Sequence, residues 1–394
     1  MAALLNGRSP APGHRPIDPT VLLGTSIGSL NAALLLSSQE SSLAGAVDDL
    51  RRTWMNEISS SGSSGNGLIR FRGRPAIFDR PGVGERTGND VFSNIAEDAI
   101  FTLRDCFSRG VKFLQGDANF EQRFLELFDL GSVVSVQPMI ELIQRRIHPD
   151  RIRLSGRKLR IPATNWRTGQ LRVFTEEHMT GTLGHLAIQA STALPGIFPS
   201  VEIEGEPYAD GGLQMNTPIA PAIVAGADVI HAVHMDPDVS SIGLPKVRNT
   251  FSSIYRLAVF AWATSVERDI ERIASVNRGL ELLEKSIRAG VDPDEIELAL
   301  SAMGRRRPGG APAFRPITVH RYYPEKRSGE TMRWLDCGKE QVTSLIQRGF
   351  DDTLRHDCVR NRCVTPQITQ PAHWPKSLGI ESLSATVPSA TWIQ

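Results

Sequence analysis

The chain has 394 residues, of which 40% are hydrophobic and 22% charged, and its formal net charge is +1 at pH 7. This composition is typical of a globular protein with one large core or two ordinary ones. The near-neutral charge, and the lack of a helix-turn-helix, zinc-finger or stacked-aromatic pattern, exclude a general nucleic-acid binder.

The first predicted elements surround the stretch TVLLGTSIGSLNAALLL. Residues 21–23 predict a buried strand, and residues 30–36 predict a buried helix. Between them lies a G-x-S-x-G motif, formed by Gly24, Thr25, Ser26, Ile27 and Gly28. Chance alone produces this motif in a chain of this length roughly one time in six. The strand–turn–helix setting is what makes Ser26 a candidate nucleophile, because it predicts a strained turn with an exposed hydroxyl. The N-terminus of the following helix would point at the same place.

A helix is expected over residues 46–58, followed by a long Gly-, Ser- and Arg-rich loop over residues 59–89. Compact domains rarely keep so long a loop unless it is functional or disordered. The arginines of residues 70–86, and Arg305 to Arg307, leave two interpretations open. They either attract anionic lipid headgroups at a membrane surface or lie in ordinary solvated loops.

The remaining elements alternate between strands and helices, which predicts an α/β fold with a mostly parallel sheet. In chain order we expect helical residues over 98–128, two strands within 158–175 around a Thr168-Gly169 turn, a helix over 183–194, a hairpin over 201–208, a strand over 227–235, helices over 249–265 and 267–289, a helix from Asp292, a loop over 304–312, a strand over 317–323 and a helix over 340–354.

Asp210 directly follows the predicted hairpin and precedes Gly211 and Gly212. An Asp-Gly pair usually marks a tight turn. Beside a nucleophile elbow it has a second interpretation, because the glycines let a carboxylate approach a serine hydroxyl and act as its base. The usual α/β-hydrolase layout does not fit, because only about 20 residues precede the elbow and that fold needs several strands there.

Three segments resemble the patatin-like phospholipases: GTSIGSLNAAL, IPATNWRTGQLRVF and AIQASTALPGIFPSVEIEGEPYADGGLQMNTPI. Their order and spacing match the family over roughly residues 20–237. The resemblance implies a layered α/β/α fold with a mostly parallel central sheet. It also implies a hydrolase of lipid or acyl-ester substrates, with Ser26 as nucleophile and Asp210 as its only partner. No histidine, metal or cofactor is then needed.

One family feature is missing. Family members open with a strand and a glycine-rich G-G-G-x-R-G turn that supplies oxyanion-hole N–H groups, and this chain has no such turn. The chain is therefore expected to begin inside the family's domain, with the Ile27 N–H as one remaining oxyanion donor. Loss of a donor commonly lowers the rate by about a hundred- to a thousand-fold. Two alternatives stay open: a catalytically impaired lipid-binding or interaction module, and a Ser–His acyltransferase.

The domain is expected to span residues 17–360, with a flexible loop at 59–89, a helical segment at 249–303 and a loose tail at 364–394. His231, His234 and Ser191 are interpreted as structural. The close pair Cys358 and Cys363 is interpreted as reduced thiols, because no second cysteine pair completes a zinc site. The N-terminus has no signal run, and no apolar segment approaches 18 residues, so a cytoplasmic location is expected, without excluding peripheral contact with an anionic membrane surface.

Overall fold

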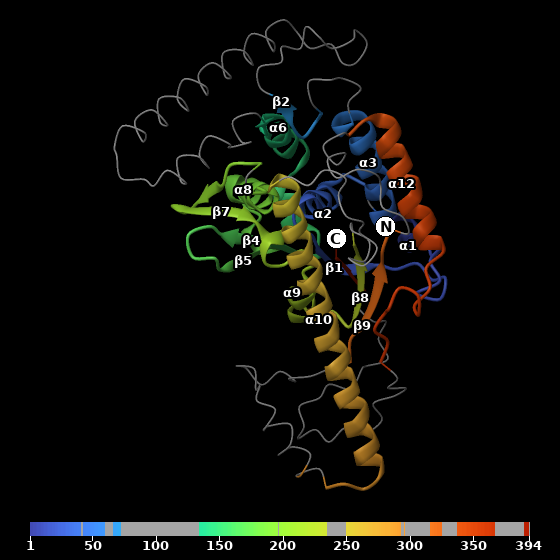
Figure 1. Ribbon diagram of the computed structural model, residues 1–394. Coiled ribbons are helices and arrows are strands. Elements are labelled where there is room, and N and C mark those ends of the chain that lie inside the picture. Colours follow the sequence, from blue (N-terminus) through green and yellow to red (C-terminus); the bar gives the residue numbers. More distant parts are fainter. Residues whose placement is uncertain are drawn as a thin grey trace, which may run out of the picture.

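The computed structural model describes residues 1–40, 42–59, 66–71, 134–195, 197–234, 250–292, 295, 316–324, 337–366 and 390–393. Its elements along the chain (Figure 1) are α1 (Ala2–Leu5), β1 (Pro19–Leu23), α2 (Ile27–Ser37), α3 (Leu43–Thr53), η1 (Trp54–Ile58), β2 (Arg70–Phe71), β3 (Val134–Ser135), α6 (Gln137–Arg146), α7 (Pro149–Leu154), β4 (Lys158–Asn165), β5 (Leu171–Thr175), η4 (Glu176–His178), α8 (Gly181–Thr192), β6 (Val201–Ile203), β7 (Glu206–Asp210), η5 (Gly211–Leu213), α9 (Ile219–Val224), β8 (Val229–Val233), α10 (Thr250–Arg288), β9 (Thr318–Tyr322), α12 (Lys339–Leu354) and β10 (Ala390–Ile393).

One mixed sheet organises the described part of the chain. Its strand order is β6-β7-β4-β1-β10-β8-β9, and β5 also pairs with β4. The pairs β4–β1, β1–β10, β10–β8 and β8–β9 are parallel, whereas β5, β6 and β7 join by antiparallel pairing. The predicted α/β class is confirmed. The strands from β4 through β1, β10 and β8 to β9 pair in parallel. At the other end of the sheet, β4 and β5 form one hairpin and β6 and β7 form another.

The buried strand and helix around the G-x-S-x-G motif are as predicted. Val21, Leu22 and Leu23 of β1 are buried. In α2, ten of the eleven residues are buried, as expected for a helix whose apolar residues cover its whole circumference. Such a helix is held by packing on all sides, so its N-terminus, where the motif lies, has a fixed position.

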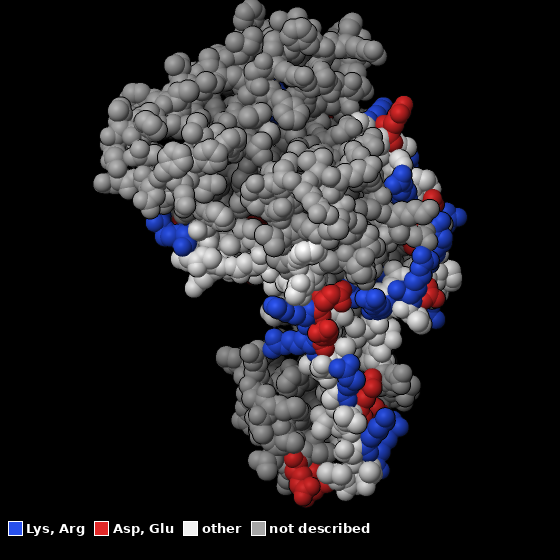
Figure 2. Space-filling model, in the orientation of Figure 1, with Lys and Arg blue, Asp and Glu red and all other residues white. Residues whose placement is uncertain are grey.

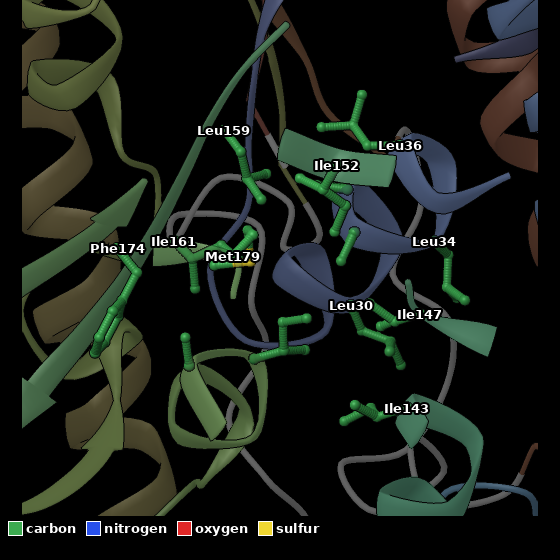
Figure 3. Close-up of a cluster of buried hydrophobic side chains, with 14 of the residues drawn as sticks. Leu30, Leu34, Leu36, Ile143, Ile147, Ile152, Leu159, Ile161, Phe174 and Met179 are labelled. Carbon is green, nitrogen blue, oxygen red and sulfur yellow. The ribbon is translucent and has the colours of Figure 1, made fainter. Parts of the chain in front are cut away.

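Helices pack on both faces of β1. Leu22 belongs to a hydrophobic cluster with residues of α2, α6 and α8, part of which is shown in Figure 3. Val21 and Leu23 point to the other face and belong to a second cluster with residues of α9 and α10. Because successive side chains of a strand alternate between faces, β1 anchors both clusters.

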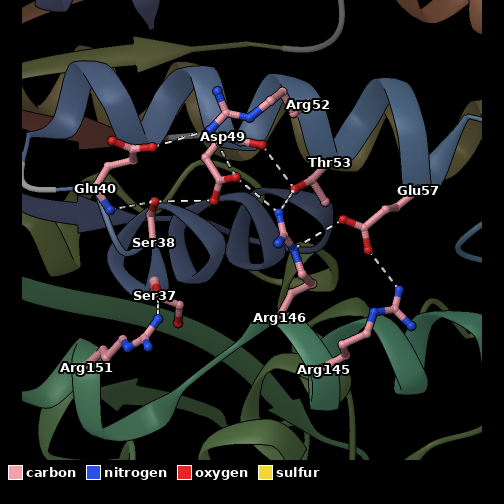
Figure 4. A network of polar contacts seen from close by, with 10 residues as sticks. All are labelled: Ser37, Ser38, Glu40, Asp49, Arg52, Thr53, Glu57, Arg145, Arg146 and Arg151. Atoms are coloured by element: carbon pink, nitrogen blue, oxygen red, sulfur yellow. Dashed lines mark hydrogen bonds and ion pairs between the residues drawn. The ribbon is translucent and has the colours of Figure 1, made fainter.

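Charged side chains tie the helices around α2 together (Figure 4). Arg146 of α6 contacts Asp49 of α3 at 3.1 Å and Glu57 of η1 at 3.3 Å. Arg151 of α7 donates a hydrogen bond to the main-chain oxygen of Ser37, at the C-terminal end of α2. These contacts fix the helices that surround the first cluster.

Several predicted elements keep their positions with altered bounds. The expected turn at Thr168-Gly169 joins β4 to β5, and the expected hairpin joins β6 to β7. The helix expected over 46–58 divides into α3 and the π-helical turn η1, and the two helices expected over 249–289 form one helix, α10. The elements expected over residues 98–128, 304–312 and most of 59–89 lie outside the described residues, as does nearly all of the helix expected from Asp292.

Two expectations about loops and tails need correction. Arg70 was counted among the loop arginines available to lipid, but it is buried in β2, which pairs with β3. Residues 390–393 were expected in a loose tail, but they form β10, a strand between β1 and β8. The sequence Ala-Thr-Trp-Ile favours this, because Thr, Trp and Ile are frequent in strands. In Figure 1 the C-terminus accordingly lies beside β1.

No helix in the described ranges is both long enough and apolar enough to cross a membrane. On the face shown in Figure 2, basic and acidic side chains of the described residues are interspersed along α10 rather than gathered by sign.

Candidate active site

Ser26 lies in a strained turn between β1 and α2. Its backbone has a φ of 56° and a ψ of −129°, and it is the N-cap residue of α2. A positive φ costs a non-glycine residue on the order of 1–3 kcal/mol and persists only where surrounding structure imposes it. Ser26 as a residue is half-buried. This is the geometry predicted for a nucleophile elbow.

Gly24 is required by close approach of the backbone within this turn. A Cβ atom at Gly24 would lie 2.1 Å from the main-chain carbon and oxygen of Gly28. Gly24 therefore lies so close to Gly28 that any side chain at position 24 would clash with the Gly28 backbone. This contact explains why the turn can reverse within five residues.

Thr25 fastens the elbow to the loop after Asp210. Its hydroxyl donates a 2.9 Å hydrogen bond to the main-chain oxygen of Met215. A Cβ atom at Gly212 would lie 3.7 Å from the Thr25 methyl carbon, which shows how closely the two loops pack. The G-x-S-x-G motif and the Asp-Gly-Gly motif are thus neighbours in space.

Asp210 ends β7 with its side chain almost completely buried, at 1% exposure. Its main-chain N–H donates to the oxygen of Ala193 at 2.9 Å, and its main-chain oxygen accepts from the Thr164 hydroxyl at 3.1 Å. Its carboxylate accepts a 2.7 Å hydrogen bond from the N–H of Gly212. A Cβ atom at Gly211 would lie 2.3 Å from the Pro162 oxygen, so this position also admits only glycine.

The Ser26 hydroxyl lies near the Asp210 carboxylate and lowers the pKa of Asp210 by hydrogen bonding. Burial raises the pKa of Asp210 to about 6, while the hydrogen bonds from Ser26 and Gly212 oppose that rise. A carboxylate with this pKa is ionised at neutral pH yet basic enough to accept a proton from a hydroxyl during a reaction. The two residues singled out in the sequence are therefore neighbours in the fold.

The remaining predicted site residues surround this pair. Ile27 is the first residue of α2, so its N–H has no acceptor within the helix and points from the same end as Ser26. Gly28 donates its N–H to the Thr25 oxygen at 2.9 Å and so closes the turn. Ile27 can therefore contribute an oxyanion donor, whereas Gly28 has a structural role.

Ser191 contacts the backbone of Ser26 directly, which the sequence did not indicate. It is fully buried in α8, and its hydroxyl accepts a 3.3 Å hydrogen bond from the main-chain N–H of Ser26. This contact holds the backbone of the strained residue. Its only signal in the sequence is its place in the segment AIQASTALP, which resembles the family segment before Asp210.

Of the two histidines interpreted as structural, His231 is buried and His234 is half-buried. His231 in β8 has a ring nitrogen 3.1 Å from the Tyr322 hydroxyl, and His234 stacks on Tyr323 with ring centroids 4.3 Å apart. Burial lowers the pKa of each to about 3, so both are neutral at physiological pH.

Comparisons with known proteins identify the family. The family model for patatin-like phospholipases matches residues 12–223, more than half of the chain and a range that includes both Ser26 and Asp210. Among solved structures, the chain is similar to the crystal structure of VipD from Legionella pneumophila, with 12% sequence identity and a TM-score of 0.29. That similarity covers 85% of this chain and 60% of the VipD chain.

Proposed function

Because the chain belongs to the patatin-like phospholipase family, we propose that it is a lipid acyl hydrolase acting through an acyl-enzyme on Ser26. The observation that carries the proposal is the hydrogen bond from the strained Ser26 to the buried Asp210 carboxylate. A serine needs a neighbouring base to become nucleophilic, and Asp210 occupies that position.

In the first half-reaction, the Ser26 oxygen attacks the ester carbonyl carbon while its proton passes to the Asp210 carboxylate. The tetrahedral intermediate then collapses, the alcohol leaves, and protonated Asp210 returns the proton to the leaving oxygen. Water attacks the acyl-enzyme in the second half-reaction, with Asp210 again accepting and returning a proton. A base with a pKa near 6 suits both directions of transfer close to neutral pH.

The developing oxyanion would be held by the Ile27 N–H at the N-terminus of α2. The helix dipole favours negative charge there, and main-chain donors need no reorganisation during the reaction. The glycine-rich turn that the family uses for further donors has no counterpart in this sequence, so we propose reduced activity toward simple esters. We also propose that the chain has the layered α/β/α arrangement of the family without the family's first strand.

One alternative function is a catalytically impaired member that binds lipids or another partner. The Ser–His acyltransferase alternative has less support, because Asp210 occupies the hydrogen-bonding position at Ser26. Lipid substrates follow from family membership. We also propose peripheral contact with an anionic membrane surface.

The decisive experiment is labelling with a fluorophosphonate probe, which reacts covalently with activated serines, together with hydrolysis of p-nitrophenyl butyrate. The wild-type chain should be labelled at Ser26, and Ser26→Ala should abolish both labelling and hydrolysis. The matched control is Ser286→Ala, on the exposed side of α10, which should behave as wild type. A folded wild-type chain that neither labels nor hydrolyses, but binds phospholipid vesicles, would favour the impaired binding module.

A further inference from the structure

A second group of reactive side chains lies far from Ser26. His320 of β9, His356 directly after α12, and Cys358 and Cys363 of the following turn bring one donor atom each into a common space. All four donor atoms lie within 4.8 Å of one another. Both histidines are buried and both thiols are half-buried. Neither the reaction proposed above nor the hydrophobic clusters account for this convergence.

The distances within the group match the edges of a metal-centred tetrahedron. The Cys358 sulfur lies 3.5 Å from Nδ1 of His320 and 3.5 Å from Nε2 of His356, and the Cys363 sulfur lies 3.4 Å from the same Nε2. With Zn–S bonds of about 2.3 Å and Zn–N bonds of about 2.0–2.1 Å, a tetrahedral zinc ion separates sulfur from nitrogen by about 3.5–3.6 Å.

Hydrogen bonding alone satisfies this group poorly. Nε2 of His356 faces two sulfur atoms but carries at most one proton, so it can donate to only one of them. A single cation at the centre contacts all four donors at once. The main-chain N–H of Arg321 also donates to the Cys363 sulfur at 3.3 Å, an outer contact of the kind that orients and stabilises a metal-bound thiolate.

We propose that His320, His356, Cys358 and Cys363 form a structural zinc site. Two thiolates and two neutral imidazoles in a tetrahedron are the donor set that selects Zn²⁺ among common divalent cations. On binding, the two thiols release their protons to solvent, and the two thiolates balance the 2+ charge of the ion. Four protein ligands leave no open position for water or substrate, so the role is structural rather than catalytic.

The site would fasten the segment after α12 to β9, the last strand in the sheet order. Val319 of β9 exchanges hydrogen bonds of 2.8 and 2.9 Å with Val364. Val364 closely follows three of the ligands, His356, Cys358 and Cys363. The fourth ligand, His320, is adjacent to Val319. Zinc would thus lock the segment after α12 against β9 and cover an edge that could otherwise pair with another chain.

The site is separate from Ser26. β9 lies three strand spacings from β1 across β10 and β8, which corresponds to about 14 Å. The sequence did not reveal it, because the cysteine pair lacked a second pair and the histidines come from β9 and the end of α12. Only the fold completes the set.

The test is metal analysis of the full chain, expressed with zinc and purified under reducing conditions without chelators. The wild type should carry about one zinc ion per chain by elemental mass spectrometry, and Cys358→Ser and His320→Ala should each lose most of it. Cys337→Ser is the matched control, since Cys337 is the one described cysteine outside the group, and it should retain zinc.

A second measurement does not depend on how the variants fold. After chelation, the wild-type chain should bind Co²⁺ with the absorption of a tetrahedral cobalt–thiolate centre, and Zn²⁺ should displace it. The proposal would be overturned by wild-type protein that holds no zinc even after reconstitution, by a cobalt spectrum without thiolate bands, or by Cys358→Ser retaining as much zinc as Cys337→Ser. A Cys358–Cys363 disulfide in the purified protein would also overturn it.

Discussion

Leu23 and Asp210 lie along the same edge of β4, with Leu23 opposite Arg160 and Asp210 opposite Ala163. The other edge of β4 is occupied by β5, which pairs with residues 160–164. The ends of β1 and β7 are therefore about 10 Å apart along one strand, at about 3.3 Å per residue. The three residues from Gly24 to Ser26 span this gap, and the Ser26 hydroxyl reaches the Asp210 carboxylate. β4 is thus the element that sets the distance between the two residues.

The first prediction concerns the pH dependence of ester hydrolysis. Asp210 accepts a proton only when it is ionised, and its pKa is raised to about 6 by burial. We expect kcat/KM for a soluble ester to rise with pH through an apparent pKa near 6 and then level off. A rise centred near pH 4, where a solvated aspartate titrates, would contradict the assignment of the base.

The second prediction concerns stability. The folded-state pKa of Asp210 lies above its ordinary value of 3.8, so the folded state binds the proton more tightly than the unfolded state does. The free energy of unfolding should therefore fall as pH rises from about 4 to about 6, by up to about 3 kcal/mol.

Asp210→Asn should remove this dependence, abolish hydrolysis and leave the protein at least as stable as wild type at pH 8. Urea unfolding of both proteins at pH 4.5 and pH 8 measures the difference. A variant that is less stable than wild type at pH 8 would show that the charge stabilises the fold.

Local patterns predicted the elbow and both hairpins because each depends on residues near one another in sequence. The apolar run before Gly24, the Thr168-Gly169 turn and the Glu204-Gly205 turn determine their own conformations. The proximity of Ser26 to Asp210 depends on β4. The Asp-Gly-Gly sequence left it as one of two interpretations, and the family resemblance then implied it. Residues 390–393 were missed because a four-residue strand has no periodicity long enough to detect. The His–Cys group was missed because its members converge only through β9 pairing and the end of α12.

The third prediction is that Gly24→Ala disrupts the elbow. Its Cβ atom would lie 2.1 Å from backbone atoms of Gly28, which cannot move without displacing the first turn of α2. We expect a clearly lower thermal unfolding midpoint and loss of probe labelling at Ser26. Gly279→Ala on α10 is the matched control, because no atom lies within 4 Å of its Cβ position. It should stabilise the helix by up to about 1 kcal/mol. Equal midpoints for the two variants would contradict this account of the turn.

The fourth prediction concerns Arg321, which is buried at 1% exposure and ion-paired with Glu267 of α10. Among the described residues, Glu267 is the acidic side chain paired with Arg321, and Glu267→Gln removes its charge. Because Glu267 is itself partly exposed, we expect a loss of about 1–3 kcal/mol rather than the larger cost of breaking a fully buried pair. Glu284→Gln breaks a pair with Arg288, an exposed arginine on the same helix, and should change the free energy of unfolding by less than about 0.5 kcal/mol. Chemical denaturation measures the free energy of unfolding of both variants. Equal losses of this free energy in Glu267→Gln and Glu284→Gln would contradict the prediction.

The last prediction tests β10 as an integral strand of the sheet. Thr391 pairs with Val21 on one side and with Ile230 on the other, so β10 bridges β1 and β8. Thr391→Pro removes one N–H from this ladder and leaves a carbonyl without its donor, which costs about 1–3 kcal/mol when the group is buried. We expect a lower urea midpoint and weaker labelling of Ser26, because β1 leads directly into the elbow. Thr391→Val keeps the N–H and the branched side chain, so it should match wild type. If the proline variant is as stable as the valine variant, residues 390–393 do not hold the central position in the sheet.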